Sequence, residues 1–366
     1  MLIQDSQELA KLCNQVSKAK YLALDTEFMR TDTYFPKLSL IQISNGDLTF
    51  AVDMLEDLDV TPLDIILQNP DIVKVIHSAR QDMEVLYNKF GHLPKNVFDT
   101  QIACQFLGFH NPPGYETIID HFLNIKVNKK LQFSNWLKRP LSNSSLLYAL
   151  NDVKHLFEAY QHICDELKAL KRYEWVVEEC RFLENNTNFI HTSTELLHKF
   201  QTYFYTEEQF AKCLVLLRWR EQIAIARDMI RRRVLSDEAI VLFVKRHVFP
   251  HYIKKYLSQD EIAGLKSKVD SFAPSAEDQK LIAEVLKHKS LRSLPKGEMF
   301  RMLQELLASI SNKKNIAASI IASSDEIARL ASYNDENIRC FSGWRFEIFG
   351  REALELRDSK SDATGL

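Results

Sequence analysis

The sequence predicts an α/β domain with helices packed on a mixed sheet, followed by a long helical region. Three observations support this prediction. Strand-like and helix-like patterns alternate over residues 1–160. From about residue 161 onward, apolar residues follow helical spacing almost throughout. The 366 residues include only 9 glycines and 10 prolines, which argues against a loop-rich all-β protein. A chain of this length usually forms two or three domains.

Short apolar runs mark the strands of the first domain. The run Tyr21–Leu24 leads directly into Asp25, which we place at the end of a strand. Two alternating segments, 38–43 and 48–52, flank the turn Asn45-Gly46, so we expect them to pair as a hairpin. Further along, we expect a buried strand at 72–76 and helices at 80–89, 114–123 and 144–160.

The helical half divides at breaks that contain proline. A helix is expected over Leu167–Leu183, which lacks glycine and proline. Phe249-Pro250 interrupts the next helical stretch, and Leu294-Pro295-Lys296-Gly297 precedes the last one. From these breaks we expect a first domain at 1–165, a helical linker or packing arm at 166–206, and helical domains at 207–287 and 288–366.

Positive charge is concentrated in one segment. The formal net charge is −2, but Ala211–Tyr256 carries an excess of 7 positive charges, so the rest of the chain carries −9. A basic segment in an acidic chain is typical of a protein that binds phosphates in one place, and a solvated helical face fits the same pattern. The candidate nucleic-acid contacts are Arg227, Arg231, Arg232, Arg233, Lys245 and Arg246.

No targeting or membrane signal is visible. The first 20 residues lack the basic start and apolar core of a signal peptide, and no segment approaches the ~18 apolar residues of a membrane span. The six cysteines are scattered without a C-x-x-C pair, which disfavours a structural zinc site and a disulfide framework. We therefore expect a cytoplasmic protein without a membrane partner.

Two carboxylates on the first strand begin the candidate catalytic set. Asp25 and Glu27 are two residues apart, so their side chains point to the same face of the strand. Such carboxylates repel each other unless a cation lies between them, and Mg²⁺ prefers oxygen ligands of this kind. Taken alone, the pattern also fits an exposed surface pair.

Two further carboxylates are expected on helices. Asp82 lies in the first turn of a helix, where it also complements the helix dipole. Tyr148 and Asp152 are four residues apart and share one helix face; a hydrogen bond between them at the edge of the core is the structural alternative. Together, four acids and a tyrosine fit phosphodiester hydrolysis in which carboxylates hold two cations about 4 Å apart.

These segments, in this order, resemble the ribonuclease D family. The resemblance is carried by Leu24-Asp25-Thr26-Glu27-Phe28 with Thr33–Gln42, His77-Ser78-Ala79 with Asp82, Phe98–Ala103, Arg139-Pro140-Leu141-Ser142 and Tyr148-x-x-x-Asp152. Later, Leu217–Val234 resembles the first HRDC domain of that family, and Ser342-Gly343-Trp344-Arg345 the end of the second. Leu147 stands where related proofreading exonucleases have histidine, so the chain is identified as a member of the tyrosine branch of the DEDD superfamily.

The resemblance implies an RNase H-like exonuclease domain followed by two all-α HRDC domains, acting as a 3′→5′ exoribonuclease. Asp25, Glu27, Asp82 and Asp152 would bind two divalent cations, Mg²⁺ or Mn²⁺, with Asp25 shared between them. Tyr148 would orient the attacking water, and Glu27 would also touch the terminal 3′-hydroxyl. Separately, Phe28 could stack on a terminal base or lie in the core. We interpret His155 as structural.

The implied substrate is precursor tRNA and other structured RNA, from whose 3′ end the enzyme would release 5′-mononucleotides. The protein is expected to be a monomer. In the first HRDC-like segment, Asp228-Met229-Ile230-Arg231 replaces the asparagine and proline typical of the family, which weakens the implied RNA binding there. Two alternatives remain open. One is a DNA exonuclease of the same superfamily, since discrimination depends on contacts to the 2′-hydroxyl. The other is a non-catalytic RNA-binding protein with the same fold.

Overall fold

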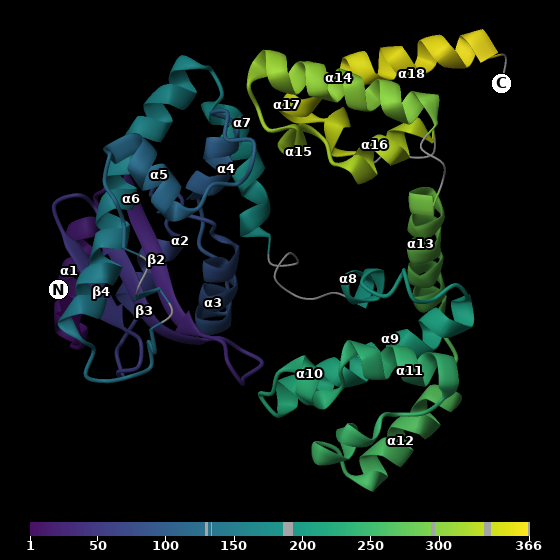
Figure 1. The fold of residues 1–366 in the computed structure, drawn as a ribbon. Coiled ribbons are helices and arrows are strands. Elements are labelled where there is room, and N and C mark those ends of the chain that lie inside the picture. The colour runs from purple at the N-terminus through teal and green to yellow at the C-terminus, as the bar shows by residue number, and fades with distance from the viewer. Residues whose placement is uncertain (129–130, 133, 186–192, 294–296, 333–337, 365–366) are drawn as a thin grey trace. The chain divides into compact units, whose positions relative to one another are not determined.

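The computed structural model describes residues 1–128, 131–132, 134–185, 193–293, 297–332 and 338–364, with the backbone alone at 194, 288–293 and 360–364. The chain divides into two compact units, each with its own core (Figure 1). Unit 1 contains Met1–Met29, Lys37–Phe189 and Lys296–Leu366. Unit 2 contains Arg30–Pro36 and Ile190–Pro295.

A mixed sheet of six strands forms the centre of unit 1. Its spatial order is β1-β4-β3-β2-β5-β6. The strands are β1 (Leu2–Ile3), β2 (Tyr21–Met29), β3 (Lys37–Ser44), β4 (Thr49–Asp53), β5 (Val73–Ile76) and β6 (Val97–Asp99). Strand β2 pairs antiparallel with β3 and parallel with β5, so the strand that carries Asp25 and Glu27 is held on both sides.

The acids lie within β2 and not at its end, so that part of the prediction is wrong. The apolar run stops at Leu24, but pairing with β3 extends from Ala23 to Met29. The backbone hydrogen bonds of this ladder keep the polar residues extended, whatever their side chains. The predicted hairpin of β3 and β4 and the buried strand β5 are confirmed.

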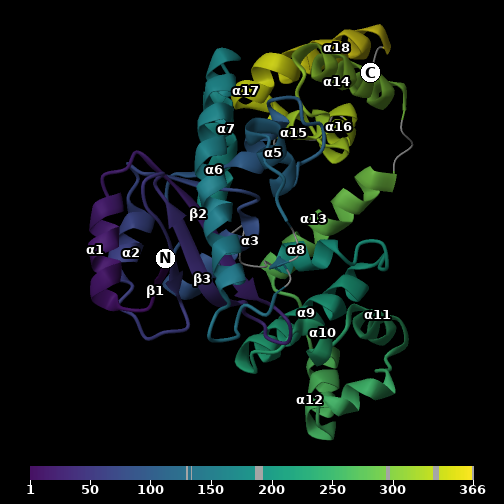
Figure 2. The same cartoon turned by 60° about the vertical axis from the view of Figure 1, so that its left-hand side comes forward.

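Helices cover both faces of the sheet. The long helix α6 (Asn143–Ala169) crosses one face, and α1 (Ser6–Val16) and α2 (Thr61–Gln68) pack together on the other (Figure 2). The remaining helices of this part are α3 (Arg80–Phe90), α4 (Thr100–Gln105), α5 (Tyr115–Leu123) and α7 (Tyr173–Cys180). The helices predicted at 80–89, 114–123 and 144–160 are thus confirmed as α3, α5 and α6.

The prediction of a single helix over 167–183 is wrong, because the chain turns between α6 and α7. Lys171 has a φ of 56°, a left-handed conformation that ends a helix. The next residue, Arg172, is buried and donates hydrogen bonds to the carbonyl of Phe106, at 2.5 Å, and to that of Lys314. These bonds hold the turn against the rest of unit 1.

The C-terminal helices share the core of the sheet domain. Trp344 stacks on Trp175, with ring centroids 5.5 Å apart, and meets the edge of Phe106 at 5.0 Å. Arg345 forms a buried ion pair with Glu179 of α7. This part comprises α14 (Glu298–Lys314), α15 (Ala318–Ile321), α16 (Ser324–Ala331), α17 (Gly343–Arg345) and α18 (Arg351–Thr364).

Unit 2 is built from helices around α9, together with the short segment Arg30–Pro36. The hydroxyl of Tyr34 donates to Glu221 at 2.7 Å and accepts from Arg231 at 2.9 Å. The Asp228 carboxylate accepts the backbone N–H of Tyr34 at 2.9 Å. The helices are α8 (Ser193–His198), α9 (Glu207–Ala226), α10 (Arg231–Val234), α11 (Asp237–Arg246), α12 (Gln259–Asp270) and α13 (Ala276–Ser293).

The predicted order of an α/β domain followed by a helical region is confirmed. Among the described residues, no strand follows Asp99. No helix in the part of the chain described here is long and apolar enough to cross a membrane. All six cysteines are buried free thiols.

Candidate active site

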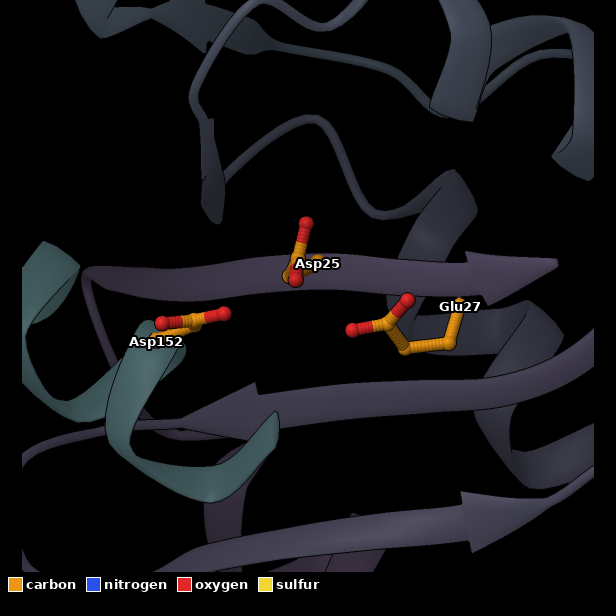
Figure 3. Close-up of side chains that lie close together, drawn as sticks. All are labelled: Asp25, Glu27 and Asp152. Carbon is orange, nitrogen blue, oxygen red and sulfur yellow. The ribbon is translucent and has the colours of Figure 1, made fainter. Parts of the chain in front are cut away.

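Three carboxylates converge beside the centre of the sheet (Figure 3). Asp25 and Glu27 project from the same face of β2, and Asp152 reaches them from α6. One carboxylate oxygen from each residue lies within 4.8 Å of the others. Asp152 is 9% exposed, and the other two side chains are partly buried. The exposed surface pair considered for Asp25 and Glu27 therefore does not describe this arrangement.

The electrostatics of this cluster favour a bound cation. Burial raises the pKa of Asp25 to about 6. It also raises the pKa of Asp152 to about 8, with Asp25 adding repulsion. For Glu27, burial and then the charges of Asp25, Asp152 and Asp82 raise the pKa to about 10. Carboxylates whose ionised forms are this unfavourable gain stability from a divalent ion between them.

Asp82 approaches the cluster from the first turn of α3 but is not one of the three convergent carboxylates. Its Oδ1 accepts a hydrogen bond of 2.5 Å from the hydroxyl of Thr26. It nevertheless lines the same cavity, and its charge contributes to the raised pKa of Glu27. Asp82 is therefore close enough to act on the cluster electrostatically.

Asp99 fixes the turn from which Asp82 projects. Its Oδ1 accepts the N–H of Ser78 at 2.9 Å, and its Oδ2 accepts that of Ala79 at 2.8 Å. Ser78 has a φ of 57°, a conformation that few residues adopt without support. The buried Asp99 also caps α4 by accepting the N–H of Gln101 at 2.8 Å.

Tyr148 lies one helical turn before Asp152. It is partly buried and lines the cavity together with Asp152. Burial, followed by the charge of Asp152, raises the pKa of Tyr148, so the hydroxyl keeps its proton near neutral pH. Its ring packs against Trp136, with centroids 6.2 Å apart.

A cavity of about 440 Å³ opens beside the carboxylates. It is partly apolar, and its wall includes Phe28, His77, Gln101, Tyr115, Val127 and Leu156. Tyr115 also donates a hydrogen bond of 2.6 Å to the backbone carbonyl of Asp152. Carboxylates repel a phosphate unless a cation lies between them, so with a divalent ion bound this cavity suits a ligand that has both phosphate and base.

Sequence reasoning assigned no individual role to Thr26, Asp99 or Tyr115. Thr26 and Asp99 stand within quoted motifs and Tyr115 does not, and apart from local caps the partners of all three are 20 to 56 residues away in the chain. Hydrogen bonds between residues this far apart in the chain leave no recognisable pattern in a single sequence. His155, interpreted as structural, is not among the residues that line the cavity.

The basic candidates of unit 2 fall into two groups. Arg227 pairs with Glu261, Arg231 with Glu221 at 2.5 Å, and Arg233 with Asp32. The second group, Arg232, Lys245 and Arg246, is exposed.

Known proteins resemble this chain over nearly its full length. Residues 1–168 match a protein family described as 3′-5′ exonuclease. Ribonuclease D of Zymomonas mobilis is 32% identical, and the match covers 98% of this chain and 94% of that protein. Ribonuclease D of Acidiphilium cryptum is 30% identical, with 98% and 93% covered. The crystal structure of Escherichia coli RNase D, an exoribonuclease involved in structured RNA processing, has a TM-score of 0.80 at 26% identity and covers 98% of both chains.

Proposed function

Because the chain belongs to the ribonuclease D family and is a 3′→5′ exoribonuclease, we propose that it shortens structured RNA one nucleotide at a time, with precursor tRNA as its main substrate class. The observation that carries this proposal is the convergence of Asp25, Glu27 and Asp152 within 4.8 Å, beside Tyr148. The similarity over nearly the full length of both chains supports the same activity.

The donor set fits divalent cations. Three buried or partly buried carboxylates repel one another, and oxygen ligands of this kind suit Mg²⁺ and Mn²⁺. We propose that Asp25, Glu27 and Asp152, joined by Asp82, hold two such ions, with Asp25 shared. Bound ions would lower the pKa of the attacking water and neutralise charge that develops on the phosphate.

The side chains around the cluster have distinct proposed roles. The Tyr148 hydroxyl keeps its proton and lies beside Asp152, so it can orient the attacking water by a hydrogen bond. Glu27 also receives the terminal 3′-hydroxyl. Phe28 lines the cavity, where its ring can stack on the terminal base.

The helical parts are proposed to be two HRDC domains, at 207–287 and 288–366, after an exonuclease domain at 1–165 and a helical linker at 166–206. The exposed residues Arg232, Lys245 and Arg246 support RNA binding by the first of them. We also propose that the protein is a monomer of the cytoplasm. Six unpaired thiols are compatible with that reducing compartment.

A 3′-extended RNA tests the proposal. The wild type should release 5′-mononucleotides with Mg²⁺ or Mn²⁺ and stop with a chelator, and Asp25→Asn and Asp152→Asn should each abolish release. Wild-type activity in either variant would contradict the site assignment. A matched single-stranded DNA in the same reaction distinguishes a DNA exonuclease, which would degrade it faster. Calorimetry that detects no binding of a divalent ion would contradict the proposed metal site.

A further inference from the structure

Arg139 stands just before α6 and uses all of its N–H groups. Nε and Nη2 donate to the two carboxylate oxygens of Asp53 at 2.7 and 2.5 Å. Nη1 donates to the carbonyls of Trp136, at 2.8 Å, and Lys138, at 3.0 Å, and Nη2 also reaches the hydroxyl of Ser39 at 3.1 Å. Asp53 ends β4 and is fully buried. This forked ion pair therefore ties the segment before α6 to the sheet.

One of these bonds anchors the backbone carbonyl of Trp136. Its carbonyl accepts a second hydrogen bond, of 2.6 Å, from the hydroxyl of Ser39 on β3. The side chain of Trp136 is 2% exposed, and within the described part of the chain its indole N–H meets no acceptor. The orientation of the indole is therefore set by its anchored backbone and by packing.

The indole packs against the ring of Tyr148. The two ring centroids are 6.2 Å apart, and the ring planes are inclined by 33°. Both rings belong to a small apolar cluster, separate from the main core of unit 1, that also contains Leu2, Met29, Leu40, Leu141 and Ala149. Because the indole is one of the groups that pack against the phenol, a shift of the indole would change where the phenol lies beside Asp152.

We propose that Arg139 is a positioning residue for the reaction, which acts on Tyr148 through Trp136. Asp53 and Ser39 are the fixed points on the sheet, Arg139 links them to the carbonyl of Trp136, and the indole holds the phenol in place. Arg139 does not line the cavity, so it does not touch the RNA there. The inference rests on the proposed role of Tyr148 in turnover.

A double-mutant cycle on kcat tests the link. Arg139→Lys keeps the positive charge beside Asp53 but loses the fork that also reaches Trp136. We expect kcat to fall about 10-fold with KM nearly unchanged, because a misplacement of about 1 Å can lower a rate on the order of 100-fold. In a Tyr148→Phe background, the same change should lower kcat by less than about 2-fold, since the hydroxyl to be positioned is already missing.

Arg345→Lys is the matched control. Arg345 is also buried and bonded, to the carbonyl of Ile320 and to Glu179, but it touches none of the site residues. Arg345→Lys should change kcat by the same factor in the wild type and in the Tyr148→Phe variant. Ser39→Ala, which removes one of the two bonds to the Trp136 carbonyl, gives a second test if Arg139→Lys does not fold.

The outcomes distinguish a failure of the positioning role of Arg139 from a failure of the proposed role of Tyr148. Independent effects of Arg139→Lys and Tyr148→Phe would overturn the positioning role while leaving the proposed function intact. An unchanged kcat in Tyr148→Phe alone would instead contradict the role of Tyr148 and, with it, the basis of this inference.

Discussion

The hydroxyl of Thr26 and the carboxylate of Asp82 are joined by a hydrogen bond of 2.5 Å, which links β2 to the start of α3. Thr26 lies between Asp25 and Glu27 in the chain, so the strand that carries two carboxylates also holds a third. Asp82 is turned toward this hydroxyl and lies outside the close cluster of Asp25, Glu27 and Asp152.

Thr26→Val should weaken the response to Mg²⁺. Valine preserves the shape but leaves Asp82 without its donor, and a hydrogen bond to a charged group contributes about 1.5–3 kcal/mol. We expect activity about 10-fold lower at limiting Mg²⁺ and a smaller deficit at saturation. A titration of rate against Mg²⁺ measures this, and Thr26→Ser should restore the wild-type curve. An unchanged titration in the valine variant would show that the bond does not orient Asp82.

Without divalent ions, the stability of the protein should decrease as pH rises. Folding raises the pKa values of Asp25, Asp152 and Glu27 from ordinary values near 4 to about 6, 8 and 10. Between those limits the folded state binds more protons than the unfolded state, so the free energy of unfolding falls with pH, by up to about 1.4 kcal/mol per pH unit for each proton. Thermal melts in chelator at pH 5, 6.5 and 8 should therefore show decreasing midpoints.

Added Mg²⁺ should remove most of this slope, because the ion favours the ionised carboxylates. Asp25→Asn is the matched variant. In chelator it should melt at a higher temperature than the wild type at pH 8, and Mg²⁺ should stabilise it less. A midpoint that rises with pH in chelator would mean that the cluster is not the source of the linkage.

Asp99→Asn should lower both stability and the affinity for Mg²⁺. The carboxylate accepts N–H bonds from Ser78, Ala79 and Gln101, and an amide NH₂ cannot accept one of them. We expect the free energy of unfolding to fall by about 2 kcal/mol, the usual penalty for a buried unpaired group. Chemical denaturation and a Mg²⁺ titration of activity provide the two measurements.

Asp59→Asn is the matched control for this change. Asp59 is exposed and accepts the N–H of Thr61 at 3.0 Å, a bond of the same kind without the burial. It should change the free energy of unfolding by less than about 1 kcal/mol. Equal losses in both variants would show that the burial of Asp99 is not what matters.

The combined variant Arg232→Ala, Lys245→Ala and Arg246→Ala should bind RNA more weakly. These side chains are exposed, whereas Arg227, Arg231 and Arg233 already have carboxylate partners. Each lost phosphate contact should reduce the slope of log affinity against log salt by about 0.7. Lysines 11, 18 and 20, also exposed, provide a control of equal charge when changed to alanine. Similar losses in the two triple variants would indicate a general charge effect.

Much of this site could be predicted because several of its residues are separated by short, characteristic spacings in the sequence. Two acids at i and i+2 on a strand, and a tyrosine four residues before Asp152, are visible in one sequence. The same was true of the hairpin at Asn45-Gly46, because its turn residues are diagnostic. The end of β2 was misplaced because cross-strand pairing, not composition, keeps Asp25–Met29 extended.

The supporting contacts could not be predicted. Asp53 and Arg139 are 86 residues apart, and Thr26 and Asp82 are 56 residues apart. No pattern of neighbouring residues in the sequence indicates that these side chains bond to each other. The break at Lys171 depends on bonds from Arg172 to Phe106 and Lys314, which exist only after tertiary folding. Local sequence patterns therefore predict the candidate catalytic residues, whereas the contacts that position these residues depend on the tertiary fold.

The stacking of Trp344 on Trp175 has a consequence for synthesis on the ribosome. Trp175 and Phe106 emerge long before the C-terminal helices that cover them. At roughly 5–20 residues per second, the nascent exonuclease domain exposes this aromatic surface on the order of ten seconds or longer. A fragment that ends after α7 would keep it exposed permanently. Such a fragment, although it holds every proposed catalytic residue, should aggregate or require chaperones.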